Sequence, residues 1–408
     1  MKKIFTVILA LICTVQLFSQ NTLTPEERKS IIDQLKTEIL DSIRNSNTVP
    51  ALSEEEKLKE TKARDWKGNL ELSAYVETYY QFDFNQPKGG NRPPFIYSFN
   101  RHNEFNVNLA LIKLNYTAPR IRANVALMAG TYSNANLAAE PVGLRNIYEA
   151  NAGIRLSKKK QLWLDGGIFA SHIGVESAIG KDCWTTTRSI PADNSPYYES
   201  GMKLTYMSDN GKFTGTALIY NGWQRIQRVE GSTLPSFGWQ ITGKPNDKIL
   251  INSSSFIGTD KADSVRQMRY FHDLYAVFNI SSKFGITVLF DVGAEQKAKG
   301  SKQYNVWYSP ELMLRYTPIE KLALAARFEY YRDKNGVMIA TGTPNGFETF
   351  GYSLNIDVMP FPNAIIRLEG RVLQSRKDGI FEDKNSNFNK LSPSLGFSFS
   401  YAFAHQFK

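Results

Sequence analysis

Charged side chains recur at every second position in the later part of the chain, and this spacing indicates what chemistry the sequence can do. Arg327 precedes Glu329 by two residues, and Arg367, Glu369 and Arg371 repeat the same step. Residues two apart on a β-strand point to one face. Charges gathered on one face of several strands create a field that orders polar solutes and sets ion preference.

We expect the polar residues of every strand to face an internal, water-filled space. Further charged residues along the chain then line the same space. Its basic members concentrate late in the sequence, and two acidic members lie on the first strand, beside the last. Each charge could instead be solvated or paired across strands; together we expect them to form a transverse field across a constriction. The predicted lining residues are Glu71, Glu77, Arg122, Arg155, Lys203, Arg315, Arg327, Arg367 and Arg371.

The sequence lacks the usual patterns of catalysis and metal binding. Four scattered histidines (His102, His172, His272 and His405) have no metal-ligand spacing. No Gly-x-Ser-x-Gly elbow, Walker loop or dinucleotide loop occurs. Ser171 and His172 are adjacent, so on a strand they point to opposite faces. The basic residues alternate with acids and do not cluster with aromatics. We therefore expect no enzyme, no cofactor, no metal and no nucleic-acid partner.

The clearest strand is the final stretch, 391–407, in which large and small residues alternate for seventeen positions. One parity carries Leu395, Phe397, Phe399, Tyr401 and Phe403, and the other carries serine, glycine and alanine almost without charge. A strand with lipid on one side and a polar lumen on the other explains this pattern, and an aromatic-rich last strand is typical of outer-membrane barrels. The alternative is an edge strand of a soluble β-sandwich.

Composition and the N-terminus indicate export. Lys2 and Lys3 precede an apolar core over 4–17, which predicts a signal peptide over 1–20. No later run of eighteen apolar residues exists, so helical membrane spans are excluded. Cys183 is the only cysteine after the signal, and an exported chain without a disulfide needs another source of stability. The aromatic content is 12%, which fits a barrel that carries a belt of aromatic side chains at each of the two membrane–water interfaces.

Residues 21–65 differ from the rest because they lack glycine, phenylalanine and tyrosine. Thr24-Pro25-Glu26-Glu27 predicts a capped helix start. Ile32, Leu35, Ile39 and Ile43 follow as one apolar stripe. We predict a periplasmic amphipathic helix and a linker. The helix either lies against the barrel mouth or forms a short coiled coil that joins subunits.

From residue 69 onward, sixteen alternating runs are separated by connections that are short and long in strict turn. The short ones carry turn residues, such as Ala118-Pro119 and Asp209-Asn210-Gly211, and the long ones reach their maximum at 173–197. A soluble fold has no reason to place all its long loops at one end. The pattern predicts an all-β, transmembrane, antiparallel up-and-down barrel of about 16 strands over 66–408, in the outer membrane, with both termini in the periplasm.

Loop 173–197 is long and rich in hydroxyls, and it contains Glu176, Trp184 and Arg188. It either folds into the pore and narrows it or forms an exposed cap. The run His172–Gly201 and the opening strand 68–84, with its three tyrosines, resemble the OmpL-like β-barrel porins of Gram-negative outer membranes. The pieces that carry the resemblance are Glu176-Ser177, Trp184-Thr185, Thr187-Arg188-Ser189, Asn194-Ser195-Pro196-Tyr197-Tyr198-Glu199-Ser200-Gly201 and Tyr75, Tyr79 and Tyr80.

The resemblance covers about residues 66–407 and implies a diffusion channel for small hydrophilic solutes, without a cofactor. The signal holds two lysines, and 21–65 holds eight basic and ten acidic residues, so the barrel segment keeps the whole formal charge of +10. The positive charge of the barrel predicts a channel that mildly prefers anions. A narrower form of this prediction is an anion-specific channel. The expected partners are outer-membrane lipid, small polar solutes or anions, and two further copies in a trimer. The alternative is a barrel anchor whose N-terminal helix binds a periplasmic partner.

Overall fold

The structure is a computed structural model that describes residues 68–407 together with Glu26, Ser30, Asp33, Gln34 and Thr37. The chain divides into two units, Met1–Asp65 and Trp66–Lys408. The five described residues of the first unit are helical, and the Thr37 hydroxyl donates to the Asp33 carbonyl at 2.8 Å. The predicted signal peptide, helix cap and linker lie outside the described residues. None of the described helices is long and apolar enough to cross a membrane.

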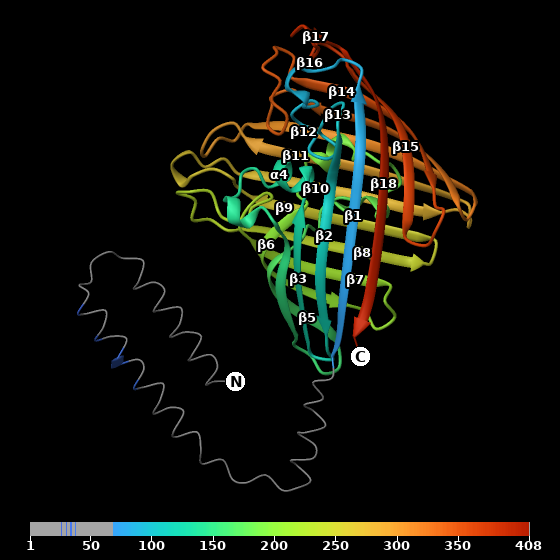
Figure 1. The fold of residues 1–408 in the computed structure, drawn as a ribbon. Helices are drawn as coiled ribbons and strands as arrows, with labels where there is room; N and C mark the ends of the chain where they lie inside the picture. The colour runs from blue at the N-terminus through green and yellow to red at the C-terminus, as the bar shows by residue number, and fades with distance from the viewer. Residues whose placement is uncertain (1–25, 27–29, 31–32, 35–36, 38–67, 408) are drawn as a thin grey trace. The chain divides into compact units, whose positions relative to one another are not determined.

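The second unit is one closed antiparallel barrel of sixteen strands (Figure 1). Every strand pairs with its sequence neighbour except at the closing seam and around one small outer hairpin. The barrel strands are β1 (Asn69–Asp83), β2 (Phe105–Thr117), β3 (Ile121–Ala129), β4 (Ile147–Arg155), β5 (Gln161–Ala170), β6 (Tyr198–Met207), β7 (Phe213–Tyr220), β8 (Ser236–Asn246), β9 (Ile249–Gly258), β10 (Arg269–Asn279), β11 (Phe284–Gln296), β12 (Tyr304–Ile319), β13 (Leu322–Asp333), β14 (Phe347–Val358), β15 (Ala364–Ser375) and β18 (Leu391–Phe407).

The seam joins β1 to β18, and their register runs without a shift from Leu70↔Phe407 to Asp83↔Ser394. Closure gives each of these two strands a hydrogen-bonded neighbour on both sides. In hydrocarbon an unpaired backbone group costs several kcal/mol, so only helices and closed barrels span a bilayer. The seam is therefore the contact that makes the sheet compatible with lipid.

The alternation in β18 separates a lipid face from an inner face as predicted. Phe397, Phe399, Tyr401 and Phe403 are 39–48% exposed on the outside, whereas serines such as Ser398 are at most 3% exposed inside. The same division holds on β11, β13, β14 and β15, where apolar positions are exposed and their neighbours are buried. The prediction of a strand between lipid and lumen is confirmed, and the soluble β-sandwich is wrong.

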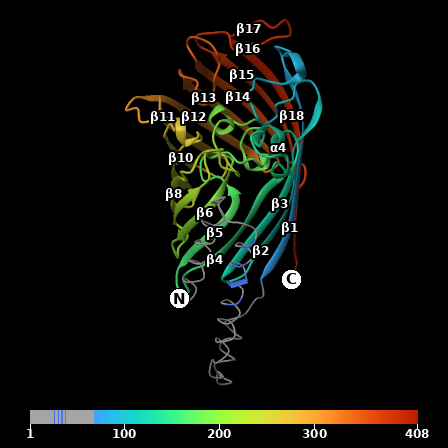
Figure 2. The ribbon, with the colours of Figure 1, turned by 90° about the vertical axis from the view of Figure 1, so that its left-hand side faces the viewer.

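The connections also follow the predicted alternation. Seven short turns lie at the end where the barrel's chain ends are, and the longer loops lie at the other end (Figures 1 and 2). By the usual topology of outer-membrane barrels the short turns are periplasmic and the long loops face outward.

The structure differs from the predicted elements in two places. The third strand ends at Ala129, and helix α4 (Thr131–Asn136), which the alternation did not predict, follows because Gly130 at φ 133° turns the chain inward. The last outer loop holds a two-stranded hairpin, β16 (Phe381–Glu382) and β17 (Phe388–Asn389), that the sequence analysis read as loop. Short helices η2 (Lys88–Gly90), η3 (Val142–Leu144), η4 (Gly180–Asp182), α5 (Ile190–Asp193) and η5 (Asp263–Val265) lie in other outer loops.

The lipid face of β18 provides a test of this arrangement. We expect Phe399→Arg to lower the free energy of unfolding by about 2–4 kcal/mol, because it places a cation in hydrocarbon near the middle of the strand. Reversible denaturant unfolding in lipid vesicles measures this. Phe361, in the turn after β14, is exposed, and Phe361→Arg should change the same quantity by less than about 0.5 kcal/mol. Equal effects of the two changes would contradict the assigned lipid face.

Candidate functional site: the lumen and its crossing loop

The longest outer loop, 171–197, enters the barrel and crosses it; we call it the crossing loop. It leaves from β5 and returns to β6, yet it bonds to β13, β14 and β15, which lie six to eight strands away around the ring of sixteen. Those strands form the opposite wall. Residues 185–195 are buried throughout. Of the two alternatives for this loop, the structure has the loop inside the barrel.

Arg327 of β13 is the centre of the contact between wall and loop. Its Nη1 donates to the Thr187 carbonyl and to the Thr185 hydroxyl, each at 2.6 Å. Its guanidinium also lies 3.4–3.5 Å from the carboxylates of Glu176, Glu329 and Glu369. The side chain has no solvent exposure. A buried cation is tolerated only with such partners, so Arg327 and the loop require one another.

Two arginines of β15 complete the attachment. Arg371 donates to the Arg188 carbonyl at 2.9 Å and to Glu329 at 2.6 Å. Arg367 donates to the carbonyls of Gly180 at 2.7 Å and Cys183 at 2.8 Å. Backbone carbonyls of the crossing loop thus accept many of the hydrogen bonds that the wall's arginines donate.

Acceptors on the same wall take the loop's donors. The Glu369 carboxylate accepts from the Thr187 amide and hydroxyl at 2.5 and 2.8 Å. The Asn355 side-chain oxygen accepts from the Thr186 amide and hydroxyl at 3.0 and 2.8 Å. The loop's polar backbone is therefore matched donor for acceptor, as buried polar groups require.

The register of the sheet explains how two arginines and their acids fit side by side. Ser353 of β14 lies opposite Arg327 on one side and Arg371 on the other. Its small side chain separates the two guanidiniums. Gly351 lies opposite Glu329, and a Cβ there would overlap the Glu329 carboxylate. Small residues on the central strand thus make room for charged ones on its neighbours.

The three candidate residues within the loop have different positions. Glu176 accepts from the Ser189 amide at 2.8 Å and from its hydroxyl. Arg188 donates to the carbonyls of Ser177 and Thr186 at 2.7 Å. Glu176 and Arg188 therefore hold the loop's own fold. Trp184 reaches β11, where a Cβ on Gly285 would lie 2.9 Å from its ring.

Asp193 joins the crossing loop to the first outer loop, accepting from the Ser98 hydroxyl at 3.0 Å. Burial raises the pKa of Asp193 to about 7, and Arg371 and the Ser98 hydrogen bond oppose this shift. The Asn194 side-chain Nδ2 also donates to the Phe95 carbonyl at 3.1 Å. The first and third outer loops therefore pack as one body inside the mouth.

The outer half of the inner wall is apolar, which the sequence analysis did not predict. Inward-facing side chains of seven strands form an aromatic collar that packs on Phe95, Ile96, Ile173 and Ile190 of the two loops. The collar consists of Leu218, Tyr220, Phe256, Phe271, Trp307, Tyr331, Phe347 and Leu373. It narrows the outer half and holds the loops in place.

The periplasmic half of the lumen is polar, and on β2–β8 many of its inward side chains are partly exposed. Three ion pairs share one arrangement: Lys113–Glu149 at 2.8 Å and Arg122–Asp165 at 2.5 Å on this side, and Arg315–Asp357 at 4.0 Å on β12 and β14. The basic side chains are 26–32% exposed and their acidic partners are 1–11% exposed. Each pair therefore presents its positive member to the water.

The predicted lining residues fall into two groups. Arg327, Arg367, Arg371 and Glu77 lie on the inner wall but are buried, the arginines under the crossing loop and Glu77 with its carboxylate accepting from Asn108 at 2.9 Å. The other five are partly exposed: Arg122 and Arg315 in the pairs above, and Lys203 with its ammonium 4.4 Å from the Phe169 ring centroid. Arg155 lies near the short turns, where its Nε donates to the Lys160 carbonyl at 3.1 Å, and Glu71 accepts from Gln406 at 3.4 Å.

Sequence reasoning missed Lys113, Asp165, Asn355 and Asp357 as partners. All four lie on the inward parity of strands that were predicted correctly, so listing every polar residue of that parity would have included them. Their pairing depends on register, which the sequence does not specify. Among the described residues no group of three or more His, Cys, Asp or Glu side chains has the arrangement of a metal site.

A closed sixteen-strand barrel with short turns at one end and a loop folded into its lumen defines the class of outer-membrane porins. The chain belongs to the family described as "Putative beta-barrel porin-2, OmpL-like", whose profile matches residues 69–404. It is an outer-membrane protein. The predicted family and outer-membrane location are thus confirmed. No curated protein is significantly similar to the chain in sequence.

Solved porins share the fold at low sequence identity. An anion-selective porin from Comamonas acidovorans is 10% identical with a TM-score of 0.55, over 83% of this chain and 100% of that one. Outer-membrane-expressed OmpT of Vibrio cholerae is 10% identical with a TM-score of 0.54, over 82% and 98%. OmpF of Salmonella typhi, in complex with daunomycin, is 10% identical with a TM-score of 0.50, over 82% and 97%.

The wall contact gives a first prediction for this site. Arg327→Met leaves Glu176, Glu329 and Glu369 buried without their shared cation, and we expect a loss of about 3–5 kcal/mol in unfolding free energy. Denaturant unfolding and amide hydrogen exchange over 185–190 measure this. Arg155→Met, at the periplasmic rim, is the control and should change stability by less than about 1 kcal/mol. Unchanged exchange of the loop in Arg327→Met would contradict the assigned role.

Asp193 gives a pH-dependent prediction. Its folded-state pKa is raised, so its contribution to loop stability is complete below pH about 4 and is lost as the pH rises through about 7. We expect exchange protection of residues 190–195, corrected for intrinsic rates, to fall about tenfold or more between pH 5.5 and pH 8. Asp193→Asn, which cannot ionise, should remove most of that fall. The same fall in both proteins would exclude Asp193 as its source.

Proposed function

We propose that the barrel is a water-filled channel for passive diffusion of small hydrophilic solutes, narrowed by the crossing loop, and that it has no catalytic role. Sixteen strands enclose more space than inward side chains can fill. The loop occupies the side of β13–β15, and the polar wall of β2–β8 faces water. The solute path therefore follows the Lys113, Arg122 and Lys203 side of the lumen. The buried arginines Arg327, Arg367 and Arg371 act through the loop that they hold.

A mild preference for anions is part of this proposal. The observation that carries it is the shared arrangement of the three ion pairs, in which the base is exposed and the acid is covered. Lys203 adds a fourth partly exposed cation to the same lumen. An ion in the lumen therefore meets positive charge although most of these bases are formally paired. The structural similarity to an anion-selective porin shows only the fold.

Assembly and partners belong to the same proposal. OmpT of Vibrio cholerae, at 8% identity, has been solved in a trimer form, which supports our expectation that this chain also forms a homotrimer in outer-membrane lipid. The alternative function is an anchor whose helix within 21–65 binds a periplasmic partner while transport is incidental. Deleting residues 21–65 separates the two: a porin still conducts in planar bilayers, whereas an anchor loses its partner.

Ion selectivity tests the proposed path. In planar bilayers with a potassium chloride gradient, we expect a reversal potential that favours chloride. Lys113→Glu with Arg122→Glu should shift it toward potassium, because both cations face the path. Lys160→Glu, which changes an exposed side chain in a short turn, is the matched control and should leave the potential unchanged. A wild-type preference for potassium, or no shift in the double variant, would contradict the proposal.

A further inference from the structure

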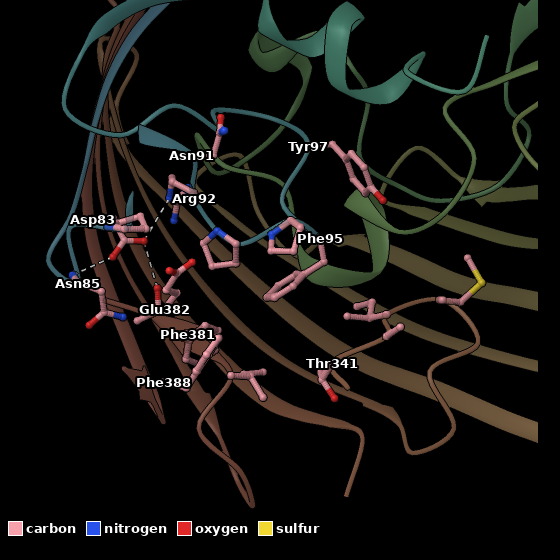
Figure 3. Close-up of a pocket in the computed structure, with 18 residues that line it drawn as sticks. Asp83, Asn85, Asn91, Arg92, Phe95, Tyr97, Thr341, Phe381, Glu382 and Phe388 are labelled. Carbon is pink, nitrogen blue, oxygen red and sulfur yellow. Dashed lines mark hydrogen bonds and ion pairs between the residues drawn. The ribbon is translucent and has the colours of Figure 1, made fainter. Parts of the chain in front are cut away.

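A cavity of about 390 Å³ lies at the outer mouth between the first, seventh and eighth outer loops (Figure 3). Pockets of this size hold small organic ligands. In Figure 3, Asp83, Arg92 and Glu382 gather at one end, Tyr97 and Thr341 lie at the other, and Phe95 stands between. The cavity thus combines aromatic walls with polar groups at both ends.

The floor of the cavity is fixed by buried contacts. Arg92 donates to the Ser394 hydroxyl at 3.0 Å and lies 3.8 Å from the Asp83 carboxylate. The Ser392 hydroxyl donates to the same carboxylate at 3.2 Å. Phe95 packs edge-on against Phe347, with ring centroids 4.8 Å apart. The site is therefore formed before any ligand arrives, so binding would cost little ordering.

Two lining residues on the outer hairpin are available to a ligand. Glu382 and Phe388 are directly opposite in the β16–β17 pair, so their side chains point to one side. Phe388 is 63% exposed, and within the described residues the Glu382 carboxylate has no hydrogen-bond or ion-pair partner. The cavity therefore offers an exposed aromatic ring next to a carboxylate whose oxygens are free to accept hydrogen bonds from a ligand.

The Tyr97 hydroxyl is a further available group at the opposite end. It too has no hydrogen-bond partner among the described residues, and it donates or accepts. A ligand that fits must therefore offer hydroxyls at both ends and an apolar face for the rings. A sugar ring does both, because its C–H face stacks on aromatic rings while its equatorial hydroxyls bond to a carboxylate in pairs.

We propose that this cavity is a recognition site for a neutral, hydroxyl-rich ring solute, a mono- or disaccharide in size, at the entrance of the barrel. Glu382 accepts two neighbouring hydroxyls, Phe388 and Phe95 contact the apolar face of the ring, and Tyr97 bonds to its far edge. The site deepens the proposed channel function by naming a solute class, although binding itself does not require conduction.

The Tyr97 hydroxyl distinguishes a hydroxyl-rich ligand from a quaternary organic cation, which an aromatic ring and a carboxylate also suit. The other charges near the cavity are paired, Arg92 with Asp83 at 3.8 Å and Arg101 with Glu104 at 2.8 Å. A quaternary cation has no group that hydrogen-bonds to Tyr97, whereas a sugar uses Tyr97, Glu382 and the rings together.

The test is titration calorimetry of the full-length protein in a detergent without a sugar headgroup. Maltose and methyl glucoside are the sugar probes, and tetramethylammonium is the probe for binding of an organic cation. We expect saturable sugar binding. Phe388→Ala and Glu382→Gln should each weaken it about tenfold or more, a loss of about 1.4 kcal/mol. Neither side chain is needed for the barrel, and unchanged unfolding of both variants verifies this.

Phe361→Ala and Glu320→Gln, which change exposed residues of the opposite turns, are the matched controls and should stay within about twofold of wild type. No saturable sugar binding, equal binding by all four variants, or binding of tetramethylammonium but not sugar would each overturn the assignment. A protein that binds maltose but does not conduct would refute the channel and keep this site. One that conducts but binds no sugar would do the reverse.

Discussion

The lack of water in a bilayer is the constraint on which this structure depends. Every backbone N–H and C=O at membrane depth must find a partner in the sheet, and the β1–β18 seam provides the last row of partners. Once the sheet is closed, the alternation of side chains separates a lipid face from an inner face. The aromatic parity of β18 then belongs outside and its serines belong inside. The fold, the location and the lumen all follow from this closure.

The interior obeys a second constraint, because charges removed from water need partners. Arg327, Arg367 and Arg371 project into the lumen from neighbouring strands, and the backbone of the crossing loop satisfies them with its carbonyls. The loop is held across the barrel because its acceptors face three fixed cations. The loop does not reach the wall of β2–β8, where Lys113, Arg122 and Lys203 stay partly exposed. These cations are the basis of the proposed preference for anions.

Strand positions could be predicted from the sequence because apolar and polar residues alternate along each strand, and this alternation is visible in the order of the residues. The predicted strand 391–407 is identical to β18, and the predicted opening strand 68–84 extends one residue beyond β1 at each end. Helix α4 was missed because its residues also suit the end of a strand, and only the φ of Gly130 redirects the chain. The hairpin β16–β17 was missed because two residues per strand show no period.

The candidate site was harder to predict, because burial within a lumen depends on which wall a loop reaches. Nothing local distinguishes Arg327, which lies under the loop, from Arg122, which faces water. The aromatic collar was hidden for a related reason. Phe271 and Trp307 occupy the parity that elsewhere carries polar residues, and only their common height in the barrel makes them a cluster.

Liposome swelling with uncharged solutes of graded size is the most direct test of a hollow, loop-narrowed cylinder. Vesicles containing the purified protein should swell fastest with the smallest solute and progressively more slowly as the solute grows. A variant without the crossing loop's central segment should admit larger solutes. Swelling no faster than that of protein-free vesicles, even with the smallest solute, would contradict the account.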